Sequence, residues 1–337
     1  MNALKNIFFL ALCLLIGLGL GKGFVAWKNH GGGGKGFTKQ EEPILITGVG
    51  DAPRQRGFTI QPGNLAALPA VLKENEEIFG TSIGLEYSSA VGKQALTDAV
   101  QAAHRKHMGF VLLPPAVFNP RNPFHKPLRD VAEDAQRAGV DVLCISWLNS
   151  EPDEAYWKQQ AAEARQAFEG QLILAATPEI MPWIGCWDAV DIVGAIGPVP
   201  IAHRAARSDA ALEMKDFRVS WDSAITSLES LAKVNTRPLA LLHMNMPANG
   251  NLQTQKLAYE ALLVETKGRA KITDILLFNW EGPDAPNKFP DVRARMTDAW
   301  DPKKPRLPDV AASEPVENGD DGAGDGGDGA ATAATGL

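Results

Sequence analysis

The chain has 337 residues, an apolar fraction of 45% and a formal net charge of −7. Its length suits one (β/α)8 barrel of about 250 residues with an extension at each end. The negative charge is concentrated in the last segment, because no Lys or Arg follows Arg306 whereas six acidic side chains lie between Glu314 and Asp328. The remainder is close to neutral, which argues against a nucleic-acid partner, since such proteins present a basic face.

The first 27 residues have the pattern of a membrane-targeting segment. Lys5 precedes an uninterrupted apolar run over 7–21, and a second apolar stretch extends from Lys22 to Trp27. No small-x-small cleavage site follows, so we expect an uncleaved signal anchor or transmembrane segment over 1–27 rather than a removed signal peptide. A Gly-rich linker over 28–41 follows. We expect a membrane-anchored protein with its folded domain outside the cytoplasm, in the periplasm or at the cell surface, although the flanking charges do not set the orientation.

Strands and helices alternate over 42–300, the expected folded domain. The stretch 139–179 shows the pattern: a buried strand, then a helix with apolar residues at helical spacing closed by Gly170, then a second buried strand. Roughly eight such units favour an α/β fold, a single-domain (β/α)8 TIM-type barrel, over a Rossmann sheet, for which no GxGxxG follows the first strand. The acidic Pro/Gly/Asp/Ala-rich tail over 301–337 is expected to be disordered. Candidate first strands are 43–50 and 57–63, the next expected strands are 81–89, 110–118, 139–152, 171–179, 191–201 and 237–247, and 272–286 is expected to hold a final strand with its loop. Expected helices are 65–80, 94–109, 127–139, 153–170, 219–235 and 252–268.

Polar and aromatic side chains cluster near the carboxyl ends of these strands, where α/β proteins keep their sites. Carboxylates there can act in catalysis, and aromatic rings can stack on sugar faces, but acidic residues also stabilise helix N-termini and aromatic rings also fill cores. For His243, the alternative is a hydrogen-bonded core histidine. The candidates, in chain order, are Glu86, Tyr87, Trp147, Asn149, Glu151, Glu179, Trp183, His243, Trp280 and Glu281.

The three cysteines give no sign of a metal site or a cofactor. Cys13, Cys144 and Cys186 form no CxxC motif and no His/Cys cluster. Cys144 lies within an expected strand, where a thiol behaves as a small apolar side chain, and the spacing does not indicate a disulfide with Cys186. We therefore expect neither metal nor cofactor.

Several segments, in order, resemble family 113 glycoside hydrolases, endo-β-mannanase-type (β/α)8 enzymes. The segments are LTDAVQAAHRKHMGFVLLPP (96–115), VAEDAQRAGVDVLCIS (131–146) and CWDAVDIVGAIGPVPI (186–201), and the resemblance extends over about 42–290. It implies a retaining mechanism, with an acid/base glutamate and a nucleophile glutamate about 5–5.5 Å apart at the ends of strands four and seven. In the alignment that the resemblance implies, these two positions hold Leu148 and His243, neither of which can perform the glutamate's role.

Three functions therefore remain open. The first is a membrane-tethered, catalytically degenerate barrel that binds carbohydrate or another envelope component through aromatic side chains. The second is an active, divergent retaining hydrolase of a β-linked polysaccharide such as mannan, with Glu151 and Glu281 as its catalytic pair or with Glu86 in place of one of them. The third is a structural partner in an envelope complex, because a fold alone does not determine function. The first and second differ in whether two carboxylates lie close enough for hydrolysis.

Overall fold

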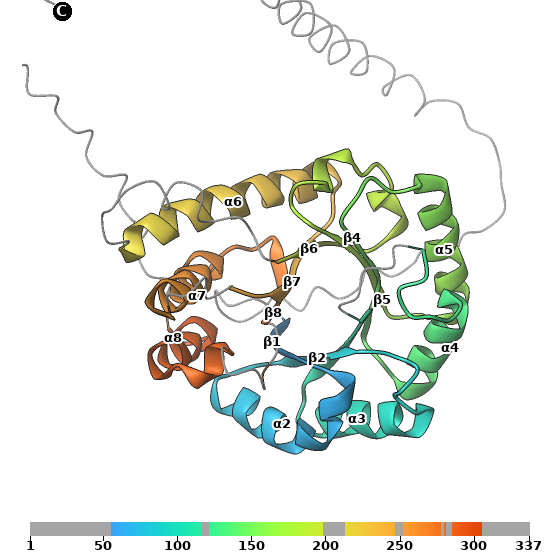
Figure 1. The fold of residues 1–337 in the computed structure, drawn as a ribbon, viewed down its shortest axis with the longest axis horizontal. Coiled ribbons are helices and arrows are strands. Elements are labelled where there is room, and N and C mark those ends of the chain that lie inside the picture. Colours follow the sequence, from blue (N-terminus) through green and yellow to red (C-terminus); the bar gives the residue numbers. More distant parts are fainter. Residues whose placement is uncertain are drawn as a thin grey trace, which may run out of the picture. The chain divides into compact units, whose positions relative to one another are not determined.

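A computed structural model describes residues 55–115, 121–197, 213–246, 252–277, 280 and 285–304. Its eight strands are all parallel and close into a barrel in chain order, with β1 paired to both β2 and β8 (Figure 1). The predicted (β/α)8 barrel is therefore confirmed. The strands are β1 Gln55–Ile60, β2 Ser82–Glu86, β3 Gly109–Leu113, β4 Val142–Leu148, β5 Gln171–Ala176, β6 Ile192–Ile196, β7 Leu239–Met244 and β8 Ile272–Leu277.

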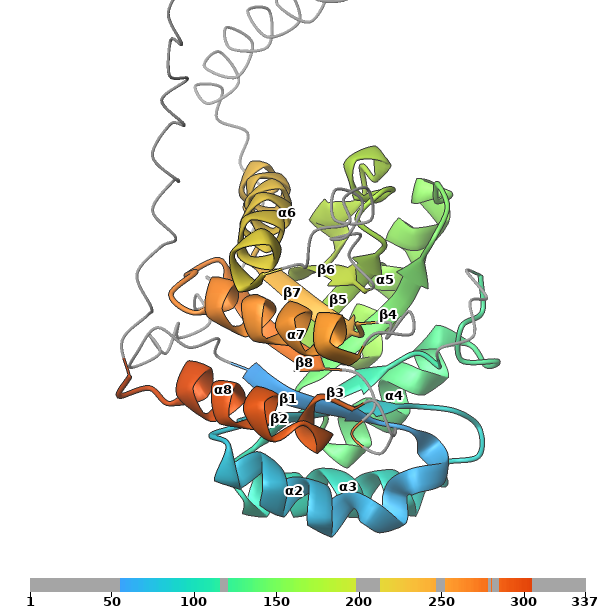
Figure 2. The ribbon, with the colours of Figure 1, turned by 60° about the vertical axis from the view of Figure 1, so that its left-hand side comes forward.

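Helices surround the barrel as an outer ring (Figures 1 and 2). In the described residues an α-helix follows every strand except β5, which connects to β6 through the short 3-10 turns η3 (Met181–Trp183) and η4 (Trp187–Ala189). The 3-10 turns η2 (Pro62–Ala67) and η6 (Pro286–Lys288) precede α2 and α8. The α-helices are α2 Leu68–Glu77, α3 Lys93–Arg105, α4 Leu128–Ala138, α5 Glu154–Ala167, α6 Met214–Val234, α7 Leu252–Thr266 and α8 Pro290–Trp300.

Local sequence explains the ends of the helices. In α4, Val131 and Ala135 lie on the buried face, and the helix ends at Gly139, whose φ of 82° is a left-handed conformation that glycine adopts at low cost. In α5, the Asp153 side chain accepts a hydrogen bond from the backbone N–H of Tyr156 and caps the first turn. The bounds of α4 and α5 therefore depend on the residues at their ends as well as on the spacing of their apolar residues.

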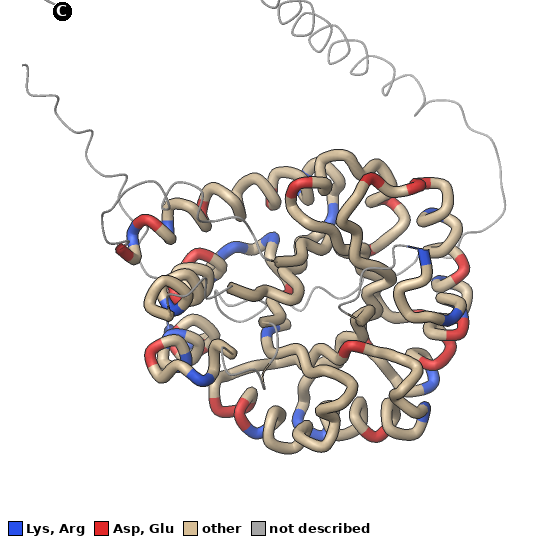
Figure 3. Tube along the Cα trace, viewed as in Figure 1, with Lys and Arg blue, Asp and Glu red and all other residues tan. Residues whose placement is uncertain are grey.

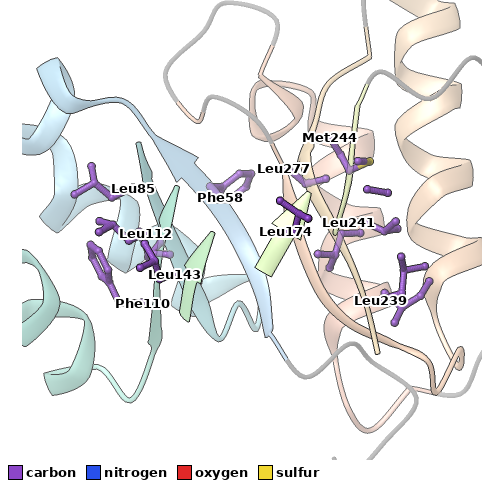
Figure 4. Close-up of a cluster of buried hydrophobic side chains, with 14 of the residues drawn as sticks. Phe58, Leu85, Phe110, Leu112, Leu143, Leu174, Leu239, Leu241, Met244 and Leu277 are labelled. Atoms are coloured by element: carbon purple, nitrogen blue, oxygen red, sulfur yellow. The ribbon is translucent and has the colours of Figure 1, made fainter. Parts of the chain in front are cut away.

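The buried side chains of the strands form two clusters, one on each face of the barrel. Alternate residues along the strands pack outward beneath the helices, and Figure 4 shows Leu85, Leu112, Leu143, Leu174 and Leu241 of this outer cluster. Because neighbouring side chains on a strand point to opposite faces, the second cluster fills the barrel interior. Its members are Val111, Leu113, Val142, Cys144, Trp147, Ile173, Ala175, Ile192, Ile196, Ala240, Leu242 and Leu276.

Several strands are shorter than expected, and two helices differ from the expectations. Helix α6 begins at Met214 rather than at Val219, because Glu213 and Asp216 form a capping box in the stretch expected to be irregular. Helix α8 was not expected, and its last residue, Trp300, is fully buried with its ring against Phe58 at a centroid distance of 6.2 Å.

The expected anchor (1–27), linker (28–41) and strand 43–50 lie outside the described residues, as does most of the expected tail. No described helix is long and apolar enough to cross a membrane.

Candidate functional site

A bulge in β4 determines which side chains face the barrel interior at its carboxyl end. The pairing with β5 shifts between Cys144 and Ser146, so that Trp147 pairs with Ala175 and Leu148 with Ala176. Trp147 thereby joins Cys144 in the interior cluster, whereas Leu148 joins the outer cluster and is 1% exposed. Without the extra residue the two side chains would exchange faces. The position implied for the family's acid/base thus points into the helix layer, and its inward neighbour is a tryptophan.

Two adjacent candidates at the end of β2 point in opposite directions. Ile83 and Leu85 belong to the outer cluster, so Glu86, the residue after Leu85, faces the interior, where it is 4% exposed. Tyr87 is turned outward, is 1% exposed and donates its hydroxyl hydrogen to Asp134 Oδ2 at 3.1 Å. Tyr87 therefore ties the end of β2 to α4.

His243 near the end of β7 completes the interior group. Its φ is 53°, and the pairing of β7 with β8 shifts between Leu241 and Met244. The imidazole packs edge-on against Trp147, with ring centroids 4.5 Å apart and planes at 69°. Its Nδ1 lies 3.6 Å from Glu86 Oε1, which is longer than a hydrogen bond. We call Glu86, Trp147 and His243 the strand-end cluster, because they converge from three strands at the carboxyl end of the barrel.

Burial dominates the electrostatics of this cluster. It lowers the pKa of His243 to about 3, so the imidazole is neutral at neutral pH and cannot serve as a general acid there. In the same interior, burial raises the pKa of the Cys144 thiol to about 12, which makes it a poor nucleophile. By contrast, Lys, Arg, Asp and Glu are interspersed along the helices of the outer ring (Figure 3).

Four exposed candidates occupy the loops beyond the strands. Trp183, in η3 after β5, is 70% exposed. Asn149 and Glu151 after β4, and Glu179 after β5, are also exposed. Glu281 lies outside the described residues.

Trp280 is turned away from the barrel interior. Its indole Nε1 donates a hydrogen bond to Glu74 Oε2 of α2 at 2.6 Å, and the Lys288 ammonium lies 4.6 Å above its ring. Arg293 Nη1 binds the other oxygen of the same carboxylate at 2.7 Å. The structure therefore places Trp280 in a contact between α2 and α8, and not with Trp147 and His243.

Supporting residues behind the site carry no signal in the sequence that would have identified them. The backbone N–H of Gly185 donates to Glu154 Oε1 at 2.7 Å, which ties the loop that carries Trp183 to the start of α5. Behind β7, Tyr259 accepts from the N–H of Met246 at 3.1 Å, and Gln255 donates to the carbonyl oxygen of the same residue at 2.6 Å. Glu154, Gln255 and Tyr259 are helix residues in the sequence pattern, and only the fold shows that they contact the loops.

The described residues contain no group of three or more His, Cys, Asp or Glu side chains arranged to hold a metal ion. Cys144 and Cys186 are buried free thiols and form no disulfide.

A parallel eight-stranded barrel with side chains converging at its carboxyl end belongs to the class of (β/α)8 proteins. No protein-family model matches the sequence, and no curated protein is similar to it in sequence. Solved structures are similar in fold. The GH113 β-mannanase of Alicyclobacillus acidocaldarius aligns with a TM-score of 0.54 at 14% identity, covering 74% of this chain and 97% of that one.

Two further structures extend the likeness. A broad-specificity GH5-4 endoglucanase of Clostridium longisporum aligns with a TM-score of 0.55 at 8% identity, covering 73% of this chain and 96% of that one. Cel5A of Thermotoga maritima, solved with mannotriose, aligns with a TM-score of 0.51 at 12% identity, covering 73% of this chain and 98% of that one. The chain therefore has a (β/α)8 fold similar to that of GH113 and GH5-4 enzymes.

Proposed function

We propose that this chain is a membrane-tethered carbohydrate-binding protein built on a glycosidase-like barrel that has lost hydrolytic activity. The contact between Trp147 and His243 carries the proposal. It joins the inward positions at the ends of β4 and β7, and its ring centroids are 4.5 Å apart. A retaining glycosidase of the resembled family would place its two carboxylates at these strand ends, about 5–5.5 Å apart. An indole and a neutral imidazole supply neither the carboxylate nucleophile nor the carboxylic acid proton that this mechanism uses.

The ligand contacts are assigned to the loops above this contact. Trp183 offers an exposed aromatic face of the kind that stacks on sugar rings. Asn149, Glu151 and Glu179 are exposed side chains that can hydrogen-bond to sugar hydroxyl groups. Membrane tethering through residues 1–27 and an extracytoplasmic location complete the proposal, and they rest on the sequence alone.

Binding and cleavage are tested separately on the purified domain from residue 42 onward. We expect retention on at least one of β-mannan, β-glucan or peptidoglycan, with no release of reducing ends above the blank. Trp183→Ala should reduce retention at least tenfold. Phe79→Ala is the matched control, because Phe79 is also an exposed aromatic residue but lies in the turn before β2, at the opposite end of the barrel.

Release of reducing ends that is abolished by Glu86→Gln or Glu151→Gln would contradict the proposal and favour the divergent hydrolase. Glu133→Gln, on the exposed face of α4, is the control for those two variants. Absence of both retention and release would leave the envelope-complex role as the surviving alternative. Tethering is tested by fractionation, in which the full chain should sediment with membranes and the chain lacking 1–41 should not.

A further inference from the structure

A concave site lies in the helix layer, outside the barrel. A cavity of about 310 Å³ opens between the loop that precedes α4 and the first turns of α5. Its volume falls at the lower end of the range for small-molecule sites, about 300–1,000 Å³. Ile145, on the outer face of β4, forms its inner wall, so β4 itself separates this lateral cavity from the strand-end cluster. Figure 1 shows α4 and α5 side by side in the ring.

Aromatic side chains form one part of the lateral cavity. Phe124 and Trp157 are 1% and 3% exposed, and Tyr156 is half-buried. The rings of Tyr156 and Trp157 meet edge to face at a centroid distance of 5.1 Å. The Tyr156 hydroxyl donates a hydrogen bond to the Arg121 carbonyl oxygen, which fixes the ring against the loop. The cavity therefore has a preformed apolar wall.

Planar polar side chains form the other part. Asn122, Gln160 and Glu163 line the cavity. Both carboxylate oxygens of Glu163 are held, one by Gln159 Nε2 at 2.8 Å and one by Gln160 Nε2 at 3.2 Å. Amide groups in fixed positions donate and accept hydrogen bonds and a carboxylate accepts them, which suits adjacent hydroxyl groups.

The charged side chains that line the cavity are of both signs, because Arg121 and Lys126 are basic and Glu163 is acidic. The Lys126 ammonium is bound to Asp134 Oδ2 at 2.7 Å and to the Tyr87 hydroxyl at 2.9 Å, so the Asp134 carboxylate offsets its charge. An apolar wall opposite planar hydrogen-bonding groups matches a neutral sugar, whose ring has an apolar C–H face and a rim of hydroxyl groups.

We propose that the lateral cavity is a second saccharide-binding site, which takes a short segment of neutral, β-linked hexoses. Its ligand class rests on the proposed function, but its residues are separate from the strand-end loops. Two sites on one barrel let a single polysaccharide, or two neighbouring chains, engage the protein at two points, which raises the overall affinity without any tighter individual contact.

The test uses the full chain in detergent with β-1,4-mannotriose and cellotriose as probes. Binding is followed by calorimetry and by NMR signals of the Trp157 indole and the side-chain amides. Gln160→Arg fills the cavity and should remove the Trp157 shift and weaken that site at least tenfold. Gln159→Arg is the matched control, because Gln159 contacts the same carboxylate but is exposed and does not line the cavity.

The outcomes separate the two sites. The lateral site is supported if the Trp157 response is lost in Gln160→Arg but kept in Gln159→Arg. A response that is also kept in Trp183→Ala shows that the lateral site binds sugar independently of the loop that carries Trp183. An unchanged response in Gln160→Arg overturns the lateral site even if Trp183→Ala lowers the affinity, in which case the proposed function stands. An unperturbed Trp157 signal in the wild type, with either sugar at millimolar concentration, also overturns it.

Discussion

At the scale of single residues, the neutral imidazole of His243 makes the stability of the barrel depend on pH. Its pKa in the folded state, about 3, lies below the value of about 6.5 expected in the unfolded chain. Above pH 6.5 both states are neutral and the residue contributes no pH dependence. As the pH falls below 6.5 the unfolded state takes up a proton that the folded state does not, so stability is lost.

His243→Asn removes this titration, and asparagine tolerates the positive φ of 53° at this position. Between pH 7 and pH 5 the wild type should lose about 2 kcal/mol of unfolding free energy more than the variant does. Urea unfolding at the two pH values measures the difference. Equal losses in both proteins would show that the imidazole is protonated in the folded state.

The residues of the strand-end cluster could be predicted from the sequence, but their contacts could not. Glu86, Trp147 and His243 could be selected because they follow buried strands. Their direct contact could not be predicted, because it depends on a bulge in β4 and on a left-handed residue in β7 that no motif announces. Likewise, Tyr87 and Trp280 stand at strand ends, but their polar atoms bind Asp134 and Glu74, which lie on distant helices.

At the scale of elements, the bulge in β4 yields a prediction about Leu148. Leu148→Glu would bury a carboxylate in the outer cluster without a partner, which should lower the unfolding free energy by several kcal/mol and yield no hydrolysis. Leu148→Met nearly conserves volume and should cost less than about 1.5 kcal/mol. Thermal unfolding and reducing-end release measure both effects. A stable Leu148→Glu protein would place this side chain in the interior and contradict the assigned register.

The junction of β2, α3 and α4 is a second element with a testable role. Asp134 is buried, and its carboxylate binds Lys93 at 2.9 Å, Lys126 at 2.7 Å and Tyr87 at 3.1 Å. Burial alone would raise the pKa of Asp134, but the hydrogen bonds from Lys126 and Lys93 outweigh it and lower the pKa. The stabilisation is therefore present at neutral pH and is lost as the pH falls through the acid range.

Asp134→Asn should reduce the unfolding free energy by about 1.5–3 kcal/mol at pH 7, because it removes charge-assisted hydrogen bonds from a buried site. The difference from the wild type should shrink at acid pH, where the wild-type carboxylate is protonated as well. Tyr87→Phe removes a single hydrogen bond and should cost about 1 kcal/mol. Chemical denaturation of the three proteins at two pH values provides the measurement, and a pH-independent difference would contradict this account.

At the scale of the whole molecule, α8 completes the ring of helices next to β1. Val292, Met296 and Trp300 are buried, and Trp300 contacts Phe58 of β1. A chain that ends at 289 should therefore fail to fold cooperatively, because the outer face of β1 is uncovered. A chain that ends at 304 should keep the wild-type Tm, as expected if the acidic tail is disordered. Calorimetry distinguishes the two, and a lowered Tm for the longer chain would assign a structural role to the tail.

The barrel itself could be predicted, because repeated buried strands and amphipathic helices report local periodicity. Helix α8 and the start of α6 could not be predicted in this way, because they depend on other interactions. Helix α8 was not expected because it begins at a proline soon after the 3-10 turn η6, and because its burial depends on a strand more than two hundred residues away in sequence. The start of α6 was missed because its capping pair, Glu213 and Asp216, is acidic and resembles a solvent-exposed loop.

The β4 bulge also determines how this barrel should be compared with the glycosidase barrels that it resembles and how it could be engineered. Counting along the sequence matches the family's acid/base to Leu148, but matching by side-chain direction pairs it with Trp147. An attempt to install hydrolysis should therefore place its two glutamates at 147 and 243. The side chains at those two positions meet in the barrel interior, with ring centroids 4.5 Å apart, whereas the carboxylates of a retaining pair lie about 5–5.5 Å apart.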